Sequence, residues 1–239
     1  MKKTFANWDI AAESPERLAA CIDHTNLKPE ADAAAIERLC REAREWNMAA
    51  VCVHPSRLKL AANCLQGSQV QLDTVIGFPL GADSLVVKEF AAYQALIDGA
   101  DEIDMVINMG MVKDGNFDYV KQEINALTAL KDERNFILKV IVETANLTEP
   151  ELIRLVYLLN DSTADYIKTS TGLAVRGVSL QDLQTINAHR SPQLLIKASG
   201  GIRRLDFALQ LIAAGADRLG CSNGEVLLQE LQERLEGDL

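Results

Sequence analysis

The sequence of 239 residues lacks the features that mark several large classes of protein. It has no basic run, and its formal charge of −10 is unfavourable for binding nucleic acid. Its apolar stretches are too short to span a membrane, and the segment after Met1 has no apolar core of a secretory leader. Neither a GxGxxG motif nor a P-loop is present. We therefore expect a soluble, cytoplasmic protein.

Cysteine and histidine are scarce as well. The five cysteines are odd in number and show no C-x-x-C spacing, which indicates reduced thiols in a cytosolic protein. The three histidines, His24, His54 and His189, form no H-x-H or H-E-x-x-H pattern, and we interpret His54 as a packing or hydrogen-bonding residue. We therefore expect no metal site and no cofactor.

The sequence does contain an alternation of short β-rich runs and longer helical patterns. The predicted strands are residues 18–25, 49–55, 71–79, 102–108, 136–144, 164–171, 193–200 and 216–222. The predicted helices are residues 32–46, 84–98, 116–130, 148–159, 179–189, 203–213 and 224–236, preceded by a short extra N-terminal helix. Eight apolar strands that alternate with helices predict an α/β fold, a (β/α)8 TIM barrel, as a single domain over residues 1–239.

Three lysines lie inside predicted strands at equal intervals. Lys139, Lys168 and Lys197 occur in ILKVIVET, DYIKTSTG and LLIKASGG, and consecutive members are 29 residues apart. One strand plus its returning helix has about this length, so the three side chains should lie at a similar height in the barrel. Ammonium groups in one cavity lower each other's proton affinity, and a lowered lysine pKa favours Schiff-base chemistry. Taken singly, each lysine is more typical of an edge or a snorkelling position.

Other polar residues stand near the carboxyl ends of predicted strands, where barrel enzymes place their working groups. Asp104 interrupts the apolar run EIDMVI, so it either pairs with a cation or serves as an acid or base. Asp23 either hydrogen-bonds to nearby loops or contacts a substrate. Further candidates are Thr25, Cys52, His54, Asn108, Glu143, Ser199 and the run Thr169, Ser170 and Thr171.

Two glycine-containing loops indicate an anion site. Gly200 and Gly201 follow Lys197 at the end of the seventh predicted strand, and the run from Gly220 to Gly224, which contains Ser222 and Asn223, ends the eighth. Each loop leads into a predicted helix, and barrels commonly bind phosphate with the loops after these two strands. The pattern therefore predicts a small phosphorylated substrate.

These residues and motifs resemble the deoxyribose-phosphate aldolase family of class I aldolases, which have a (β/α)8 fold. The resemblance extends from IDHTNLKP through VCVHP, TVIGFPLG, EIDMVINMG and LKVIVET to IKTSTG and KASGGIR. It implies that Lys168 forms a Schiff base, that Lys197 lowers the pKa of Lys168, and that Asp104 transfers protons. The implied reaction is the reversible cleavage of 2-deoxy-D-ribose 5-phosphate to D-glyceraldehyde 3-phosphate and acetaldehyde.

The resemblance also implies roles for surrounding residues and a homo-oligomer. Lys139 would belong to the polar network around Asp104, and the pocket for the phosphorylated sugar and short aldehydes would be lined by Asp23, Thr25 and Cys52. The phosphate would be held at Gly172, Gly200, Gly201 and Ser222, and we add Thr171 and Asn223 as substrate-binding candidates. Two departures bear on the substrate: the 173–179 segment of LAVRGVSL is not glycine-rich, and Asn223 stands where a serine is common. Two alternatives remain, a Schiff-base lyase for another phosphorylated sugar and a non-catalytic barrel that binds a sugar phosphate.

Overall fold

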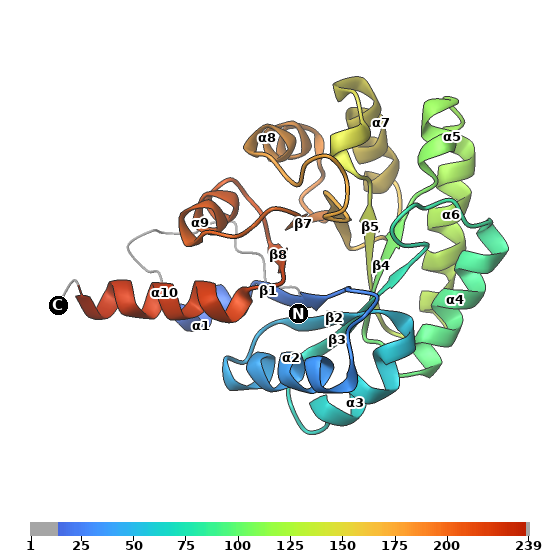
Figure 1. Ribbon diagram of the computed structural model, residues 1–239. Coiled ribbons are helices and arrows are strands. Elements are labelled where there is room, and N and C mark those ends of the chain that lie inside the picture. Colours follow the sequence, from blue (N-terminus) through green and yellow to red (C-terminus); the bar gives the residue numbers. More distant parts are fainter. Residues whose placement is uncertain (1–13, 238–239) are drawn as a thin grey trace.

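The predicted strands pair in sequence order into a closed parallel barrel (Figure 1). The computed structural model describes residues 14–237. Its strands are β1 (Ile22–Asn26), β2 (Ala50–Val53), β3 (Gln71–Ile76), β4 (Glu102–Val106), β5 (Ile137–Ile141), β6 (Tyr166–Lys168), β7 (Leu195–Ser199) and β8 (Arg218–Cys221). The eighth strand pairs with the first and closes the sheet, which confirms the predicted TIM barrel.

The helices surround the barrel and connect successive strands (Figure 1). They are α1 (Pro15–Ala19), α2 (Ala33–Glu45), α3 (Leu58–Leu65), α4 (Leu85–Ile97), α5 (Met109–Lys113), α6 (Phe117–Ala129), α7 (Glu149–Asn160), α8 (Leu180–His189), α9 (Leu205–Ala213) and α10 (Gly224–Gly237). Short 3-10 helices are η2 (Pro55–Arg57), η3 (Leu130–Asp132) and η4 (Thr144–Asn146). All seven predicted helices are confirmed, and α3 and α5 were not predicted. No helix within 14–237 is long and apolar enough to cross a membrane.

The prediction of the first strand is wrong at its beginning. Residues 18–21 were assigned to a strand, but Leu18 and Ala19 belong to α1 and the strand begins at Ile22. Ser14 caps this helix by accepting a hydrogen bond from the backbone of Arg17, and proline follows at the first helical position. The remainder of the predicted N-terminal helical segment, residues 1–13, lies outside the described residues.

Local capping fixes the start of several helices. Asp32 accepts a hydrogen bond of 2.8 Å from the backbone nitrogen of Ala35 at the start of α2. Ser179 and Asp182 form a reciprocal capping box at the start of α8. These side chains satisfy backbone donors that have no partner within the helix, so the loops end at defined positions.

The apolar core lies between the strands and the helices. Outward-facing strand residues such as Val51, Ile103, Val140 and Ile196 are buried there against the helices. Burial of this apolar surface is the main favourable contribution to folding. The barrel interior is different, because many of its inward-facing residues are polar or charged.

The strand register sorts the inward-facing side chains into layers of four, as in other TIM barrels. The lowest layer comes from the even strands and holds Ala50, Glu102, Tyr166 and Arg218. The middle layer comes from the odd strands and holds Asp23, Asp73, Lys139 and Lys197. The upper layer returns to the even strands and holds Cys52, Asp104, Lys168 and Gly220.

Candidate active site

Asp104 joins the three lysines that the sequence singled out. Lys168, the last residue of β6, donates a hydrogen bond of 2.7 Å from Nζ to Oδ2 of Asp104. Lys197 Nζ donates to the same oxygen at 2.6 Å, and Lys139 Nζ donates to Oδ1 at 2.8 Å. Asp104, Lys139 and Lys197 are fully buried, and Lys168 is 3% exposed. The expected polar network is therefore present.

Three further carboxylates surround the two deeper lysines. Lys197 Nζ lies 2.5 Å from Oδ2 of Asp23 and donates to Oδ2 of Asp73 at 2.9 Å. Lys139 Nζ lies 2.6 Å from Oε2 of Glu102 and 3.1 Å from Oδ1 of Asp73. Each of these lysines thus faces at least three acidic groups across the barrel axis.

Arg218 completes the cluster from below. Its guanidinium donates one hydrogen bond to Oδ1 of Asp23 and another of 2.8 Å to Oε1 of Glu102. We call the whole set the barrel charge cluster; its cations are Lys139, Lys168, Lys197 and Arg218, and its carboxylates are Asp23, Asp73, Glu102 and Asp104. When all eight groups are ionised, the four positive and four negative charges cancel.

The cluster shifts the proton affinities of its members. Burial alone would raise the pKa of Asp104, but Lys139, Lys168 and Lys197 outweigh it and hold that pKa well below its usual range. Burial alone would lower the pKa values of Lys139 and Lys197, but the carboxylates, Asp104 first among them, raise both well above 10.5. Lys197 does lower the pKa of Lys139 by repulsion, but the carboxylates outweigh it, so the expected net decrease in lysine pKa is wrong for Lys139 and Lys197.

Two carboxylates of the middle layer behave in opposite ways. Burial would raise the pKa of Asp23, but Arg218 and Lys197 lower it below its usual value. Asp73 has no arginine partner, and burial together with the charge of Asp104 raises its pKa to about 6. The lysines beside Asp73 oppose that increase without cancelling it.

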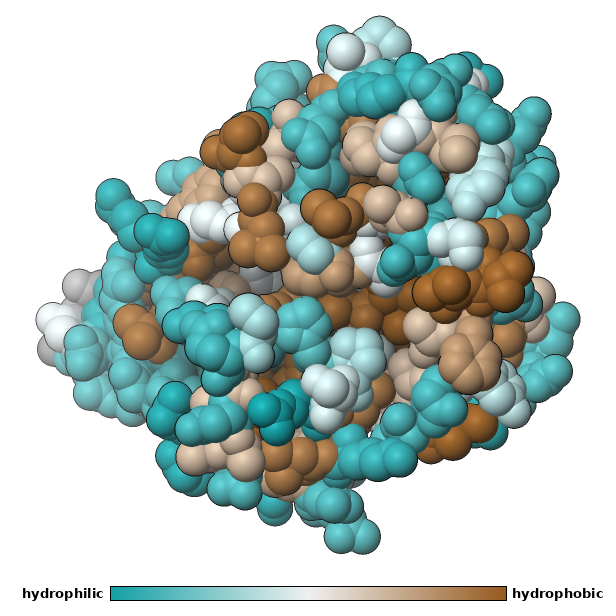
Figure 2. All heavy atoms as spheres, turned by 45° about the vertical axis from the view of Figure 1, so that its right-hand side comes forward, coloured by the Kyte–Doolittle hydropathy of each residue, from teal (hydrophilic) through white to brown (hydrophobic). Residues whose placement is uncertain are grey.

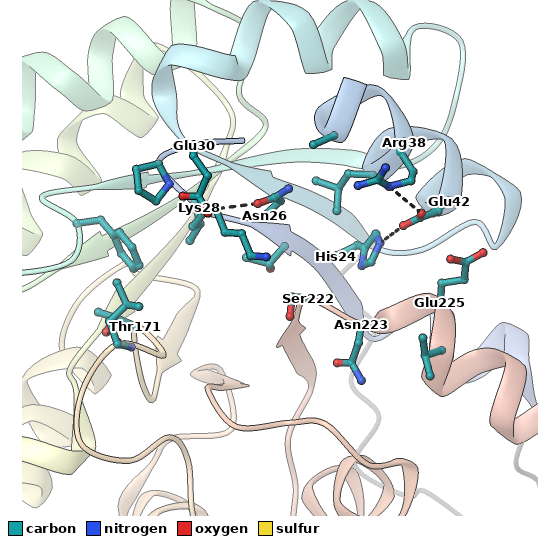
Figure 3. Close-up of a pocket in the computed structure, with 18 residues that line it drawn as sticks. His24, Asn26, Lys28, Glu30, Arg38, Glu42, Thr171, Ser222, Asn223 and Glu225 are labelled. Carbon is teal, nitrogen blue, oxygen red and sulfur yellow. Dashed lines mark hydrogen bonds and ion pairs between the residues drawn. The ribbon is translucent and has the colours of Figure 1, made fainter. Parts of the chain in front are cut away.

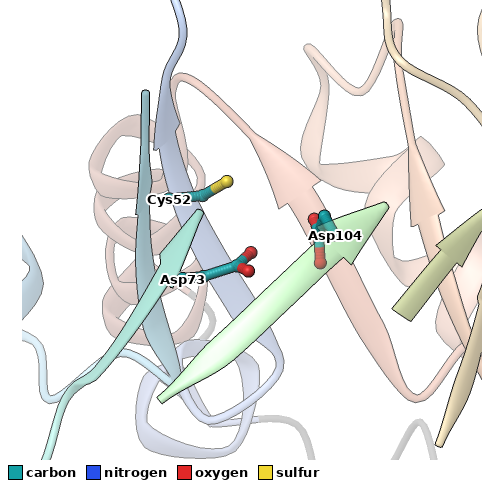
Figure 4. A group of neighbouring side chains, drawn as sticks. All are labelled: Cys52, Asp73 and Asp104. Atoms are coloured by element: carbon teal, nitrogen blue, oxygen red, sulfur yellow. The ribbon is translucent and has the colours of Figure 1, made fainter. Parts of the chain in front are cut away.

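Cys52 lies beside the carboxylates of Asp73 and Asp104 (Figure 4). Burial, followed by the charge of Asp73, raises the pKa of the Cys52 thiol well above 9.0, so the group stays protonated and is a poor nucleophile. Donor atoms of Cys52, Asp73 and Asp104 lie within 4.8 Å of one another, as do those of Asp23, Asp73 and Glu102. Lysine ammonium groups already neutralise these carboxylates, so their oxygen atoms act as ion-pair partners. That the reaction needs no metal ion stays a prediction.

Gly220 makes room for Lys197. A Cβ atom at Gly220 would lie 3.1 Å from Cε of Lys197 and 3.0 Å from Cβ of Ser199. The upper layer therefore lacks a side chain where the lysine of the middle layer rises toward Asp104. The glycine that the sequence suggested for an anion loop has a packing role.

Glu143 anchors the loop that follows Lys168. Its Oε2 accepts hydrogen bonds of 3.0 Å from the backbone nitrogen and 2.5 Å from the hydroxyl of Thr171. Its φ of 50° lies in the left-handed region, which is rare for residues other than glycine and costly to hold. Oε1 of Glu143 is buried without a hydrogen-bond partner among the described residues. The hydroxyl of Thr171 is thus committed to Glu143.

The loops after β6 and β7 lie against each other through glycine. Gly172 and Gly200 both have positive φ values, 87° and 84°, and a Cβ atom on Gly200 would lie 3.2 Å from Cα of Gly172. A Cβ atom on Gly177 would lie only 1.9 Å from the carbonyl oxygen of Gly200. Gly201 faces open space. Bare backbone at this corner can approach an anion closely.

A cavity of about 710 Å³ opens above the carboxyl ends of β1 and β8 (Figure 3). Residues on its wall include Thr25, Lys28, Arg38, Thr171, Ser222 and Asn223. Lys168 does not line it; Thr25 belongs to the next layer above Lys168 in the strand register. A second cavity of about 330 Å³ includes Glu143, and Thr171 and Leu173 lie on both walls. The 173–179 loop therefore begins between the two cavities.

The structure separates the predicted binding residues into two groups. Thr25, Thr171, Ser222 and Asn223 line the larger cavity, whereas Asp23 is fully buried within the charge cluster. Its contact with a substrate stays a prediction, as do those of Cys52, Lys139 and the glycines. Asn223 also donates a hydrogen bond of 3.2 Å to the carbonyl of Arg203, which links the loops after β7 and β8.

Three other strand-end candidates have structural partners. His54 hydrogen-bonds to the carbonyl of Leu27 at 3.0 Å, as its interpretation as a hydrogen-bonding residue requires. Asn108 caps α5, and the hydroxyl of Ser199 donates to the carbonyl of Ser170 at 2.5 Å. These contacts fix loops around the cluster.

Sequence reasoning missed Asp73, Glu102 and Arg218. Glu102 and Asp104 are two residues apart, so in a strand both side chains point to one face, and this spacing could have revealed Glu102. Arg218 stands two residues before Gly220 on the same face of β8. Asp73 gave no such signal, because a single aspartate near a strand start is also common in turns.

Known proteins share this fold and much of the sequence. Residues 17–230 match the model of the DeoC/LacD family aldolase group. A deoxyribose-phosphate aldolase of Clostridium perfringens (strain 13 / Type A) is 46% identical over 207 residues, which are 87% of this chain and 92% of the relative.

Solved structures agree with this match. The aldolase QR15 is similar with a TM-score of 0.86 and 37% identity, over 92% of this chain and 97% of the other. A tetrameric deoxyribose phosphate aldolase from Aeropyrum pernix has a TM-score of 0.85 and 31% identity, over 92% of this chain and 93% of the other.

The charge cluster predicts that Arg218→Met destabilises the fold strongly. The substitution leaves Asp23 and Glu102 buried with one cation fewer, and breaking such a pair costs about 3–5 kcal/mol of unfolding free energy. Urea denaturation followed by circular dichroism measures the loss. Arg204→Met is the control, because Arg204 is 81% exposed and its pairing with Asp206 should contribute less than about 1 kcal/mol. Equal losses in both variants would contradict the prediction.

Proposed function

This chain belongs to the DeoC/LacD family of aldolases, and we propose that it reversibly cleaves 2-deoxy-D-ribose 5-phosphate by a class I mechanism. The products are D-glyceraldehyde 3-phosphate and acetaldehyde, and the whole reaction takes place in one barrel domain. The observation that carries the proposal is the contact of Lys168 with a buried aspartate that also binds a second lysine. A Schiff base needs such an amine and a nearby path for protons.

In this mechanism the uncharged amine of Lys168 attacks the carbonyl carbon of the sugar. Loss of water gives an iminium ion, which accepts the electron pair released when the C–C bond breaks. Asp104 lies within hydrogen-bond distance of the reacting nitrogen, and Lys197 donates to the same oxygen. We propose that these two residues carry the protons that interconvert iminium and enamine.

The phosphate is proposed to bind at the open ends of β6, β7 and β8. Ser222 and Asn223 line the larger cavity together with Thr171, which directly precedes Gly172, and Gly200 packs against Gly172. Backbone N–H groups and a helix N-terminus favour a phosphate, and α10 begins directly after Asn223. Leu173 lines this cavity and is exposed, so it places an apolar side chain at the mouth, which bears on substrate preference.

A homo-oligomer is proposed to form through α4. This helix buries Ala92, Ala95 and Leu96 against the barrel. Its opposite face also carries exposed apolar side chains at helical spacing, namely Val86, Phe90, Tyr93 and Ile97. Figure 2 shows apolar surface on the right-hand side, where α4 comes forward. The tetrameric relative supports a second copy of this chain as the occupant. The cytoplasmic location stays a prediction from the cysteine pattern.

We predict that borohydride reduction in the presence of acetaldehyde attaches an ethyl group to Lys168. Only an imine can be reduced to a stable secondary amine, so mass spectrometry of the whole protein and of its peptides identifies the reacting lysine. Lys168→Met should show no adduct and no cleavage of 2-deoxyribose 5-phosphate. A label on Lys139 or Lys197 would refute the assignment, and an adduct without cleavage would indicate another phosphorylated sugar as substrate.

Lys197→Leu should raise the pH at which Lys168 can be trapped. Removing this cation leaves Asp104 and its neighbours with excess negative charge, which favours the protonated amine by about one pH unit or more, each unit being about 1.4 kcal/mol. Adduct yield against pH gives the midpoint, and circular dichroism checks folding. Lys59→Leu is the control, because Lys59 is 78% exposed. An unchanged midpoint would show that Lys197 does not tune Lys168.

Phe90→Glu should reduce the molar mass in solution toward that of one chain. The carboxylate would place a charge in the centre of an apolar interface, where it has no partner. Light scattering coupled to size-exclusion chromatography measures the mass. Leu235→Glu, an equally apolar-to-acidic change on α10, should leave the mass unchanged. A monomeric wild type, or an oligomeric Phe90→Glu, would contradict the role of α4.

A further inference from the structure

Asp73 is a buried carboxylate that the proposed reaction does not yet use. It lies in the middle layer on β3, its Oδ2 accepts a hydrogen bond from Lys197, and its Oδ1 lies 3.1 Å from Nζ of Lys139. Titratable groups from five other strands surround it: Asp23 on β1, Cys52 on β2, Glu102 and Asp104 on β4, Lys139 on β5 and Lys197 on β7. Asp73 is therefore close to every member of the charge cluster except Lys168 and Arg218, which lie at its two ends.

The nitrogen of Lys168 changes its charge during Schiff-base chemistry. It is positive in the ammonium and iminium states, and uncharged in the free amine, the carbinolamine and the enamine. In the positive states, the four cations of the cluster balance the four carboxylates. In the uncharged states one carboxylate lacks a counter-charge, which is unfavourable in a buried site. One carboxylate must then hold a proton.

We propose that Asp73 is the carboxyl group that holds the proton while the nitrogen of Lys168 is uncharged. The inference rests on the proposed Schiff-base function. Asp73 reaches the reacting nitrogen only through Lys197 and Asp104, so it is a positioning residue for the proton and does not touch the substrate.

The proton path follows three hydrogen bonds. Lys168 donates to Oδ2 of Asp104 at 2.7 Å, Lys197 donates to the same oxygen at 2.6 Å, and Lys197 donates to Oδ2 of Asp73 at 2.9 Å. One lysine thus bridges the carboxylate beside the reacting nitrogen and the carboxylate that stores the proton. No atom has to move by more than a hydrogen-bond length.

The proton transfer conserves atoms, electrons and charge. When iminium becomes enamine, a C–H bond next to the iminium carbon breaks, its electron pair forms the C=C bond, and the C=N pair becomes the lone pair on nitrogen. Asp104 receives the released proton, while Lys197 passes one of its protons to Asp73 and is resupplied from Asp104. The total charge of the cluster and its bound intermediate is unchanged, and the reverse sequence returns the proton to carbon.

The surroundings of the carboxylates favour Asp73 for this role. Three lysines donate to or approach Asp104, and they keep it ionised; Asp23 is kept ionised by Arg218 and Lys197. Asp73 has a pKa raised to about 6 by burial and by Asp104, so it accepts a proton more readily than either. The proton arrives at Oδ2, which already accepts the hydrogen bond of Lys197, while Oδ1 keeps its ion pair with Lys139 at 3.1 Å.

Asp73→Asn tests the proposal with two measurements that a purely structural role would not change. The variant has three carboxylates, so the uncharged amine of Lys168 becomes the balanced state, and the trapping midpoint should fall by about one pH unit. Exchange of the methyl protons of acetaldehyde for deuterium reports iminium–enamine interconversion. It should slow by about a hundredfold, because asparagine takes up no proton. Asp101→Asn, outside the cluster, is the matched control and should change neither.

The outcomes separate this inference from the proposed function. If wild type is not trapped at Lys168, the Schiff-base function itself fails. If wild type is trapped and Asp73→Asn keeps both its midpoint and its exchange rate, Asp73 is only a structural partner and the inference is overturned. Should Asp73→Asn not fold, Asp73→Glu decides. In wild type, exchange is lost as pH falls through about 6, because a protonated Asp73 accepts nothing. Asp73→Glu should change the pH at which the exchange rate falls. An unchanged pH for this loss overturns the inference.

Discussion

Charge neutrality inside a sealed barrel is the constraint on which this structure depends. Charged groups lose their hydration when they are buried, and only close opposite charges compensate that loss. Here the compensation extends over three layers, from Arg218 at the floor to Lys168 at the mouth. The amine of Lys168 can therefore be buried and still change its protonation state. Carboxylates one or two contacts away compensate each change in its charge.

The fold separates stability from chemistry. The apolar core lies outside the strands, between sheet and helices, so the barrel interior is free to carry polar groups that would weaken an ordinary core. Layer packing still applies inside, and Gly220 shows how: the upper layer has a gap where the long side chain of Lys197 passes. Loop anchors such as Glu143 then fix the mouth, at the expense of a left-handed backbone conformation.

The sequence predicted the barrel, the three lysines and Asp104, because repeated strand–helix units and an equal lysine spacing are long-range patterns. It did not predict Asp73, because a single aspartate near the start of a strand is also common in turns. The start of the first strand was misplaced because LAAC is apolar in either conformation, and the Ser14 cap decided for a helix. Opposing pKa shifts of Asp23 and Asp73 could not be foreseen, because they depend on which cation each carboxylate meets across the barrel.

A balanced cluster also restricts how such a sequence can diverge. Replacing one charged residue inside the barrel by a neutral one leaves a buried charge without a counter-charge. Loss of an acidic residue together with a basic one leaves the cluster neutral. Evolutionary changes that keep the protein folded should therefore be paired substitutions at positions far apart in the chain, as Glu102 and Arg218 are, 116 residues from each other. Among descendants of this protein, these positions would be expected to co-vary as a set with a fixed sum of charge.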